Sequence, residues 1–277
     1  MTMTALLRGR SACVRATATW LRPQETRALS TVVTDEVSKF NRVSDDWWSP
    51  KSTSGVGPLH QLNPVRVKYI RSHVIEQFGG SDDDGLPLRD LRVVDVGCGG
   101  GILSEALCRI GANMISVDPG VDNIEAAKRH AQRHEVTHTI DYRCCTSDDL
   151  VAAGEQFDVV CSLEVIEHVS DPKAFIQSLT PLVKPGGLLF LSTINRTLLS
   201  GALAIGMAEY VMRIVPPGTH DWNKFLEPHE ITRVLKQENM TVKDVSGIVG
   251  NPILRDWRID PNCKAINYIL CAAKPAE

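Results

Sequence analysis

The sequence predicts an α/β protein built on an open, mostly parallel sheet with helices on both faces. Two observations support this prediction. A buried strand, a glycine-rich loop and a helix follow one another at residues 93–110, an order that begins many nucleotide-binding sheets. Strand-like and helix-like patterns then alternate along the chain, as expected where crossover helices join parallel strands.

The first strand reads Val-Val-Asp-Val at residues 93–96, and Gly-Cys-Gly-Gly-Gly follows at residues 97–101. β-branched apolar residues are typical of a strand buried on both faces. The glycines permit a sharp turn and let a ligand approach the backbone closely. The helix expected at residues 102–110 places Leu103, Leu107 and Ile110 on one face.

The remaining elements follow from hydrophobic periodicity and turn residues. Further strands are expected at residues 114–117, 140–145, 157–163, 188–193, 242–249 and 265–272, the last two as an antiparallel pair. Together with the first strand they make a seven-stranded sheet. Helices are expected at residues 35–77 with a break at 49–58, at 121–134, at 172–182 and from Pro228. Within the first of these, Asn63 is expected to cap a helix that has Pro64 at its first position.

The glycine loop leaves three alternatives: a dinucleotide site, another adenosine site, or a turn without a ligand. The dinucleotide fingerprint requires Gly or Ala at position 102, where this chain has Ile102. The second strand ends in Asp118, 21 residues after Gly97. An acidic residue there accepts both hydroxyls of a ribose in any adenosine ligand. The pattern Asp-x-Gly-x-Gly-x-Gly at 95–101 with this acidic residue resembles the S-adenosylmethionine (SAM) site of the Rossmann-like methyltransferases.

The composition limits the classes of partner and the compartment that we expect for this chain. The chain has 277 residues, of which 43% are hydrophobic and 23% charged, with a formal net charge of −3. This balance is typical of a globular domain and gives no argument for nucleic-acid binding. The eight cysteines contain no Cys-x-x-Cys pair, so we expect free thiols and a reducing compartment rather than disulfides or a zinc site.

Residues 1–33 differ from the rest of the chain. They hold five arginines, no lysine and a single acid, Glu25, and are rich in Ser and Thr. This composition predicts a mitochondrial or plastid transit peptide, with cleavage next to Ser30, ahead of one domain over residues 34–277. A disordered basic tail is the alternative.

Glu164, Glu167 and His168 follow the fourth strand at spacing i, i+3 and i+4. If this stretch is helical, the three side chains share one face. Two carboxylates and an imidazole can hold a divalent cation, magnesium being favoured by the oxygens and zinc, manganese or iron by the imidazole. The alternatives are that these residues stabilise a turn, or that His168 acts as a general base.

Residues 197–215 contain only two charged residues, Glu209 and Arg213. The stretch just reaches the length of a bilayer span, but its charges and glycines argue against one. We interpret it, within a broader insertion at about 196–225, as a helical segment that lies on a membrane or covers the active site. An ordinary core helix is the alternative.

Five motifs together resemble the ubiquinone-biosynthesis O-methyltransferases over nearly the whole chain from residue 35 to residue 274. They are Asn-Pro-x-Arg at 63–66, Asp-Val-Gly-Cys-Gly-Gly-Gly at 95–101, Glu-Val-Ile-Glu-His-Val at 164–169, Thr-Ile-Asn-Arg-Thr at 193–197 and Gly-Thr-His-Asp-Trp at 218–222. The resemblance implies the Rossmann-like fold, with SAM contacts at Arg66, Gly97, Asp118 and Leu163 and a Mg²⁺ site at Glu164, Glu167 and His168. From spacing alone, Arg66 is instead expected to be a surface residue.

The resemblance also implies the substrates and the location. The acceptors would be a polyprenyl dihydroxybenzoate and a demethylubiquinol. The enzyme would lie on the matrix side of the mitochondrial inner membrane, as a peripheral protein in a multi-subunit biosynthetic complex. A methyltransferase for another small molecule, or a non-catalytic scaffold with a SAM fold, are the alternative functions.

Overall fold

The computed structural model describes residues 31–52, 54, 56–79, 85–202, 221–251 and 256–276. The predicted transit peptide therefore lies outside the described residues, apart from its last three. Most of the predicted insertion lies outside them as well, since only residues up to Ala202 and from Asp221 are described.

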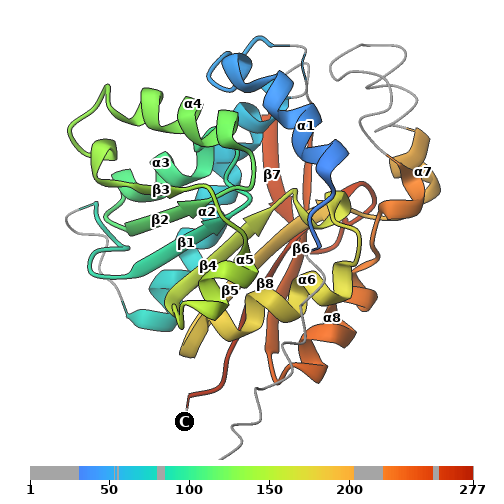
Figure 1. The fold of residues 1–277 in the computed structure, drawn as a ribbon. Coiled ribbons are helices and arrows are strands. Elements are labelled where there is room, and N and C mark those ends of the chain that lie inside the picture. Colours follow the sequence, from blue (N-terminus) through green and yellow to red (C-terminus); the bar gives the residue numbers. More distant parts are fainter. Residues whose placement is uncertain are drawn as a thin grey trace, which may run out of the picture.

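One eight-stranded sheet runs through the molecule in the order β3-β2-β1-β4-β5-β8-β6-β7 (Figure 1). The strands are β1 (Arg92–Val96), β2 (Asn113–Val117), β3 (Asp141–Arg143), β4 (Phe157–Leu163), β5 (Val183–Ile194), β6 (Thr241–Asn251), β7 (Asp256–Asp260) and β8 (Asn267–Ala273). The first five pair in parallel, and β8 pairs antiparallel to both β5 and β6. This confirms the predicted mostly parallel sheet and its antiparallel last pair.

Strand β7 is an addition to the seven predicted strands. It pairs antiparallel with β6 at the edge of the sheet. Its sequence, Asp-Trp-Arg-Ile-Asp, alternates charged and apolar residues, and no residue in it is fully buried. A short, charged edge strand resembles a loop in sequence, because only one of its faces has a core to cover.

Helices cover both faces of the sheet (Figure 1). Those that pack on the sheet are α2 (Gly57–Phe78), α3 (Ile102–Arg109), α4 (Val121–Ala131), α5 (Ser147–Ala152), α6 (Pro172–Leu179) and α8 (Pro228–Gln237). One buried cluster joins α2, α3 and α4 to Val93, and a second joins α5, α6 and α8 to Val94. Adjacent residues of β1 thus serve opposite cores, as the period of two in a strand requires.

The N-terminal part was predicted as two helices with a break, and the break is confirmed. Helix α1 (Thr34–Arg42) is followed by a short 3₁₀ helix, Ser44–Asp46, and α2 begins at Gly57. The predicted cap at Asn63 is wrong, because α2 begins six residues earlier and contains Pro64 in its interior. The Asn63 amide instead donates to the carbonyl of Ile102 at 3.0 Å.

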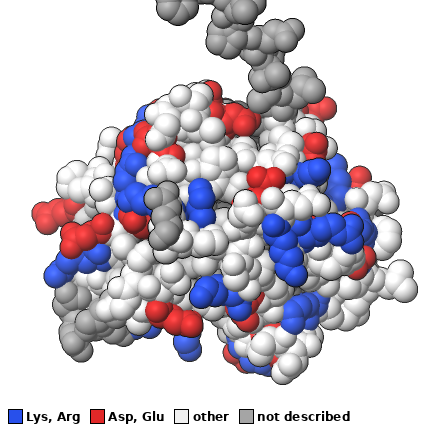
Figure 2. All heavy atoms as spheres, turned by 90° about the horizontal axis from the view of Figure 1, so that it is seen from below, with Lys and Arg blue, Asp and Glu red and all other residues white. Residues whose placement is uncertain are grey.

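The surface charges and the exposed apolar residues bear on the predicted partners. In the face shown in Figure 2, Lys and Arg form several separate groups with acidic and uncharged side chains between them. Among the residues that the structure describes, no helix has the length and apolar composition needed to cross a membrane. Where the insertion begins, α7 (Leu198–Ser200) presents Leu198 and Leu199 at 88% and 49% exposure.

Candidate active site

A cavity of about 240 Å³ lies at the carboxyl ends of β1, β2 and β4, under α1. Open α/β sheets bind their ligands at this edge. All seven predicted site residues line the cavity: Arg66, Gly97, Asp118, Leu163, Glu164, Glu167 and His168. The structure therefore brings together residues that are up to 102 positions apart in sequence.

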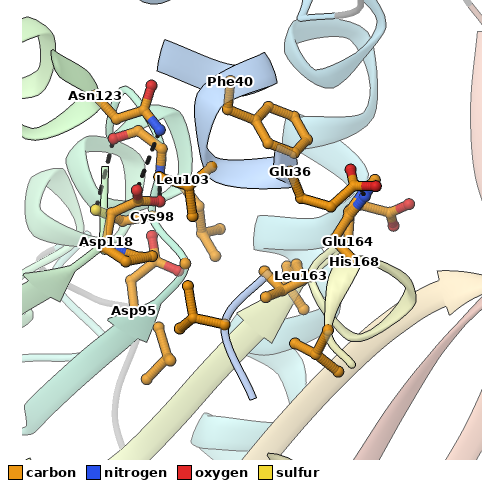
Figure 3. Close-up of a pocket in the computed structure, with 18 of the residues that line it drawn as sticks. Glu36, Phe40, Asp95, Cys98, Leu103, Asp118, Asn123, Leu163, Glu164 and His168 are labelled. Carbon is orange, nitrogen blue, oxygen red and sulfur yellow. Dashed lines mark hydrogen bonds and ion pairs between the residues drawn. The ribbon is translucent and has the colours of Figure 1, made fainter. Parts of the chain in front are cut away.

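The cavity has two chemically different ends (Figure 3). Asp118 and Asn123 lie at one end, beside the glycine loop. Glu36, Phe40 and His168 lie at the other, together with Glu164. The first end suits a polyhydroxylated ligand, and the second offers an imidazole next to an aromatic ring and two carboxylates.

The glycine loop needs its glycines for two separate reasons. Gly97 has a φ of +78° and Gly99 a φ of +52°, a left-handed conformation that side chains with a Cβ rarely adopt. The Trp47 ring also packs so closely on Gly99 and Gly100 that an added Cβ at either position would overlap it. The glycine loop thus follows directly from β1, and Trp47, in the segment after α1, packs over it.

The carboxylate of Asp118 is held in a fixed orientation by hydrogen bonds from its neighbours. Asp118 is 8% exposed, and it accepts hydrogen bonds from Gly99 N at 3.0 Å, Gly120 N at 2.8 Å and Asn123 Nδ2 at 3.1 Å. Burial raises the pKa of the Asp118 carboxyl, and these hydrogen bonds oppose that rise. Because they fix both oxygens, little reorganisation is needed when a ribose binds.

Arg66 is buried and lines the cavity, so the surface position expected from spacing is wrong. Its contact with SAM stays a prediction from the resemblance. Arg66 is 4% exposed, and its Nη2 lies 2.9 Å from Glu164 Oε1. Its Nε has no hydrogen-bond partner among the described residues. A buried guanidinium with a spare donor beside a ligand cavity suits recognition of a carboxylate.

Glu164 is held in an unusual backbone conformation. Its φ is +58°, although it is not a glycine. Its Oε1 accepts from Ser192 Oγ at 2.7 Å and pairs with Arg66. Such strain costs on the order of 1–3 kcal/mol and is retained where the surroundings fix it, often at functional sites.

Glu164, Glu167 and His168 do not share a helical face, because Glu164 is left-handed and only Ile166–His168 forms a 3₁₀ turn. Glu167 is buried and its Oε2 accepts from Thr193 Oγ1 at 2.9 Å. Burial, followed by repulsion from Glu164, raises the pKa of Glu167. His168 Nδ1 lies 3.1 Å from Glu36 Oε2.

The three predicted ligands are not arranged as a magnesium site in this structure. Within the described residues, no three His, Cys, Asp or Glu side chains are placed to hold one cation. Each of the three predicted ligands is instead engaged by a protein partner: Arg66 and Ser192, Thr193, or Glu36. These contacts use Glu164 Oε1, Glu167 Oε2 and His168 Nδ1 and leave the second ligand atom of each residue uninvolved. The arrangement as it stands gives the metal no support.

Sequence reasoning missed two groups at the site. Glu36 and Trp47 both fall in the helical stretch expected before the break at residues 49–58, and neither was assigned a contact in the site. Their partners lie 132 and 76 positions away, so no local spacing reveals them.

The seven described cysteines are free thiols, as expected, and burial raises the pKa of Cys98 beside the cavity.

Comparisons with known proteins agree with the geometry. A family model described as "Methyltransferase domain" matches residues 66–245. A protein named "Ubiquinone biosynthesis O-methyltransferase" from Dinoroseobacter shibae is 41% identical over 251 residues, covering 91% of this chain and 100% of the relative. One of the same name from Methylobacterium nodulans is 45% identical over 241 residues, covering 87% and 95%.

A solved structure shows the same fold. Magnesium protoporphyrin IX methyltransferase from Synechocystis PCC 6803, with bound SAM, superposes with a TM-score of 0.58 at 18% sequence identity. The match covers 88% of this chain and 99% of that chain. At that identity the likeness concerns the fold alone.

Proposed function

Since this chain belongs to the ubiquinone biosynthesis O-methyltransferases, which are SAM-dependent enzymes, we propose which acceptor it methylates and how. The acceptor is a catechol-type ring that carries a polyprenyl chain, as a polyprenyl dihydroxybenzoate or a demethylubiquinol. The observation that carries this proposal is the two-ended cavity, with the proposed ribose acceptor at one end and an imidazole beside an aromatic ring and carboxylates at the other.

At the first end, the residues of this chain bind and orient SAM. The carboxylate of Asp118 accepts the ribose hydroxyls, and the glycine loop at residues 97–101 packs on the amino-acid part. Arg66 donates to the carboxylate of that part. Leu163, at the end of β4, supplies an apolar contact on the cavity wall.

At the second end, His168 takes the proton of the attacking phenol. A free phenol has a pKa near 10, so at neutral pH its oxygen needs a base to become a good nucleophile. As the proton moves to the imidazole, the oxygen forms a bond to the methyl carbon. The carbon–sulfur bond breaks, its electron pair stays on sulfur, and S-adenosylhomocysteine leaves as a neutral thioether. The rest of the rate acceleration comes from holding the phenol and SAM next to each other in the cavity.

Magnesium at Glu164, Glu167 and His168 remains a prediction from resemblance, and we derive no step from it. A direct test is to treat the protein with a chelator and then measure transfer to a soluble catechol. Turnover that survives supports His168 as the base. If turnover is lost on chelation and returns when Mg²⁺ is added, His168 is not the base and the Mg²⁺ site is supported.

The proposed location is the matrix surface of the mitochondrial inner membrane, within a biosynthetic complex. The arginine-rich residues 1–33 support the organelle, and the two exposed leucines of α7 support contact with a membrane. Arg196, at the start of the predicted insertion, is engaged by Glu230 at 2.7 Å and is therefore poorly placed to bind lipid head groups. The relatives named above are bacterial, so they say nothing about an organelle.

One experiment tests the proposal as a whole. The protein is incubated with methyl-labelled SAM and a short-chain dihydroxybenzoate, and the products are separated by mass. Label on a ring oxygen is the expected result. Label on carbon would indicate another kind of methyltransferase. SAM binding without any transfer, to this acceptor or to a demethylubiquinol analogue, would favour the scaffold.

A further inference from the structure

Glu36 of α1 lies at the centre of a cluster that joins three separate segments. Its Oε2 lies 3.1 Å from His168 Nδ1, and its Oε1 lies 3.2 Å from Lys224 Nζ. Lys39, on the same helix, is also 3.2 Å from Oε1. The side chain of Glu36 is only 12% exposed. His168 and the two lysines thus surround the Glu36 carboxylate on both of its oxygens.

The contact with Glu36 determines which nitrogen of His168 faces the acceptor. A carboxylate only accepts hydrogen bonds, so Nδ1 must be the nitrogen that donates to it. In the neutral ring Nε2 then keeps its lone pair, and it has no partner among the described residues. A carboxylate on one ring nitrogen fixes both the tautomer and the ring orientation.

A second residue of α1 contacts the same imidazole. Phe40 lies one helical turn after Glu36, and its ring meets that of His168 edge to face, with centroids 5.0 Å apart. Figure 3 shows Glu36 and Phe40 coming from α1 toward the end of the cavity where His168 lies. The same helix also places Val37 in the cavity lining.

We propose that Glu36 is a positioning residue for the reaction: it holds His168 by Nδ1 so that Nε2 meets the acceptor hydroxyl, while Phe40 restrains the plane of the ring. The proposal deepens the function given above and rests on it. The N-terminal helix, and not only the sheet that binds SAM, thereby forms part of the catalytic end.

A purely structural role explains these contacts less well. No residue of α1 is fully buried, so the helix adds little to the two cores of the sheet. Glu36 and Phe40 face the acceptor end of the cavity. The SAM residues Gly97 and Asp118 instead follow directly after β1 and β2. Loss of the Glu36 carboxylate should therefore alter the imidazole and the acceptor step, but not SAM binding.

The test compares Glu36→Gln, Glu36→Asp and the control Asp35→Asn in the whole chain. Asp35 is an exposed neighbour on the same helix, so its variant removes the same charge away from the cavity. For Glu36→Gln we expect kcat on a soluble catechol to fall about 10- to 100-fold, the range known for carboxylates that orient metal-bound histidines. Affinity for S-adenosylhomocysteine, measured by calorimetry, should stay within twofold. Glu36→Asp should restore part of the activity, and Asp35→Asn should behave like the wild type.

Long-range ¹H–¹⁵N spectra of His168 give a readout that needs no turnover. The wild type should show a proton on Nδ1 in the neutral ring, and Glu36→Gln should shift the ring toward a mixture of tautomers. The same spectrum in both proteins, together with an unchanged kcat, would overturn the proposal. If instead the wild type shows the Nδ1 proton but transfers no methyl group to a catechol, the proposed function fails while the positioning contact stands.

Discussion

Trp47 donates its indole N–H to Asn123 Oδ1 at 2.9 Å, and Asn123 Nδ2 donates in turn to Asp118 Oδ1 at 3.1 Å. This chain of hydrogen bonds links the segment that covers the glycine loop to the proposed ribose acceptor. Trp47→Phe keeps an aromatic ring over the loop but removes the first donor. Because one buried hydrogen bond contributes about 0.5–1.5 kcal/mol, SAM affinity should fall about two- to tenfold in calorimetry.

Trp222 offers a matched control. Its indole N–H donates to the Thr197 carbonyl at 3.0 Å, away from the cofactor end of the cavity. Trp222→Phe should leave SAM affinity unchanged. Equal losses in both variants would mean that the Trp47 effect is not specific to the site.

Asp118→Ala should weaken SAM binding by roughly 1–3 kcal/mol, because it removes the ribose acceptor and leaves two backbone N–H groups without their partner. Calorimetry with a folded variant measures this loss, and circular dichroism checks the fold. Asp122→Ala, an exposed position on the next helix, serves as the control. Unchanged affinity in Asp118→Ala would remove Asp118 from the site.

The buried carboxyl of Asp95 should make stability depend on pH. Burial raises its pKa to about 6, whereas an unfolded aspartate titrates near 3.9. The folded state therefore binds this proton more tightly, and its contribution to stability falls as pH rises from about 4 to about 6. Above pH 6 the ionised group costs the fold on the order of 2–3 kcal/mol.

Asp95→Asn should remove this cost. Urea unfolding without SAM should show the variant more stable than the wild type by about 2 kcal/mol at pH 7.5, and by much less at pH 4.5. Exposed Asp122→Asn should show no such difference between the two pH values. A gain for Asp95→Asn that is the same at both pH values would contradict the assignment.

Leu198 and Leu199 should contribute to membrane contact if the enzyme works at a lipid surface. Replacing both with serine removes exposed apolar area, and each buried methylene contributes about 0.8 kcal/mol. Flotation with vesicles of inner-membrane lipids should weaken at least tenfold, while SAM affinity and activity on a soluble catechol stay unchanged. Val136→Ser, at a residue that is 52% exposed, is the control. Unchanged flotation would exclude this pair as the membrane contact.

The sequence predicted the sheet well because buried parallel strands carry a strong local signal, as in the run of apolar residues in β1 and β4. It failed where the outcome depends on contacts across the fold. The spacing of Glu164 and His168 suggested one helical face, but the hydrogen bond from Ser192 and the ion pair with Arg66 hold Glu164 in a left-handed conformation. The role of Glu36 was hidden for the same reason, since its partner follows a strand on the other side of the cavity.

The position of β8 has a consequence for how the chain acquires its structure during synthesis. This strand is the last in sequence, yet it lies between β5 and β6. Strands β6 and β7 therefore have no pairing with the parallel half of the sheet until residues 267–273 are in place. A chain still emerging from a ribosome can assemble the SAM end of its cavity early. It can close the rest of the sheet only at the last step, and chaperones would be expected to hold it until then.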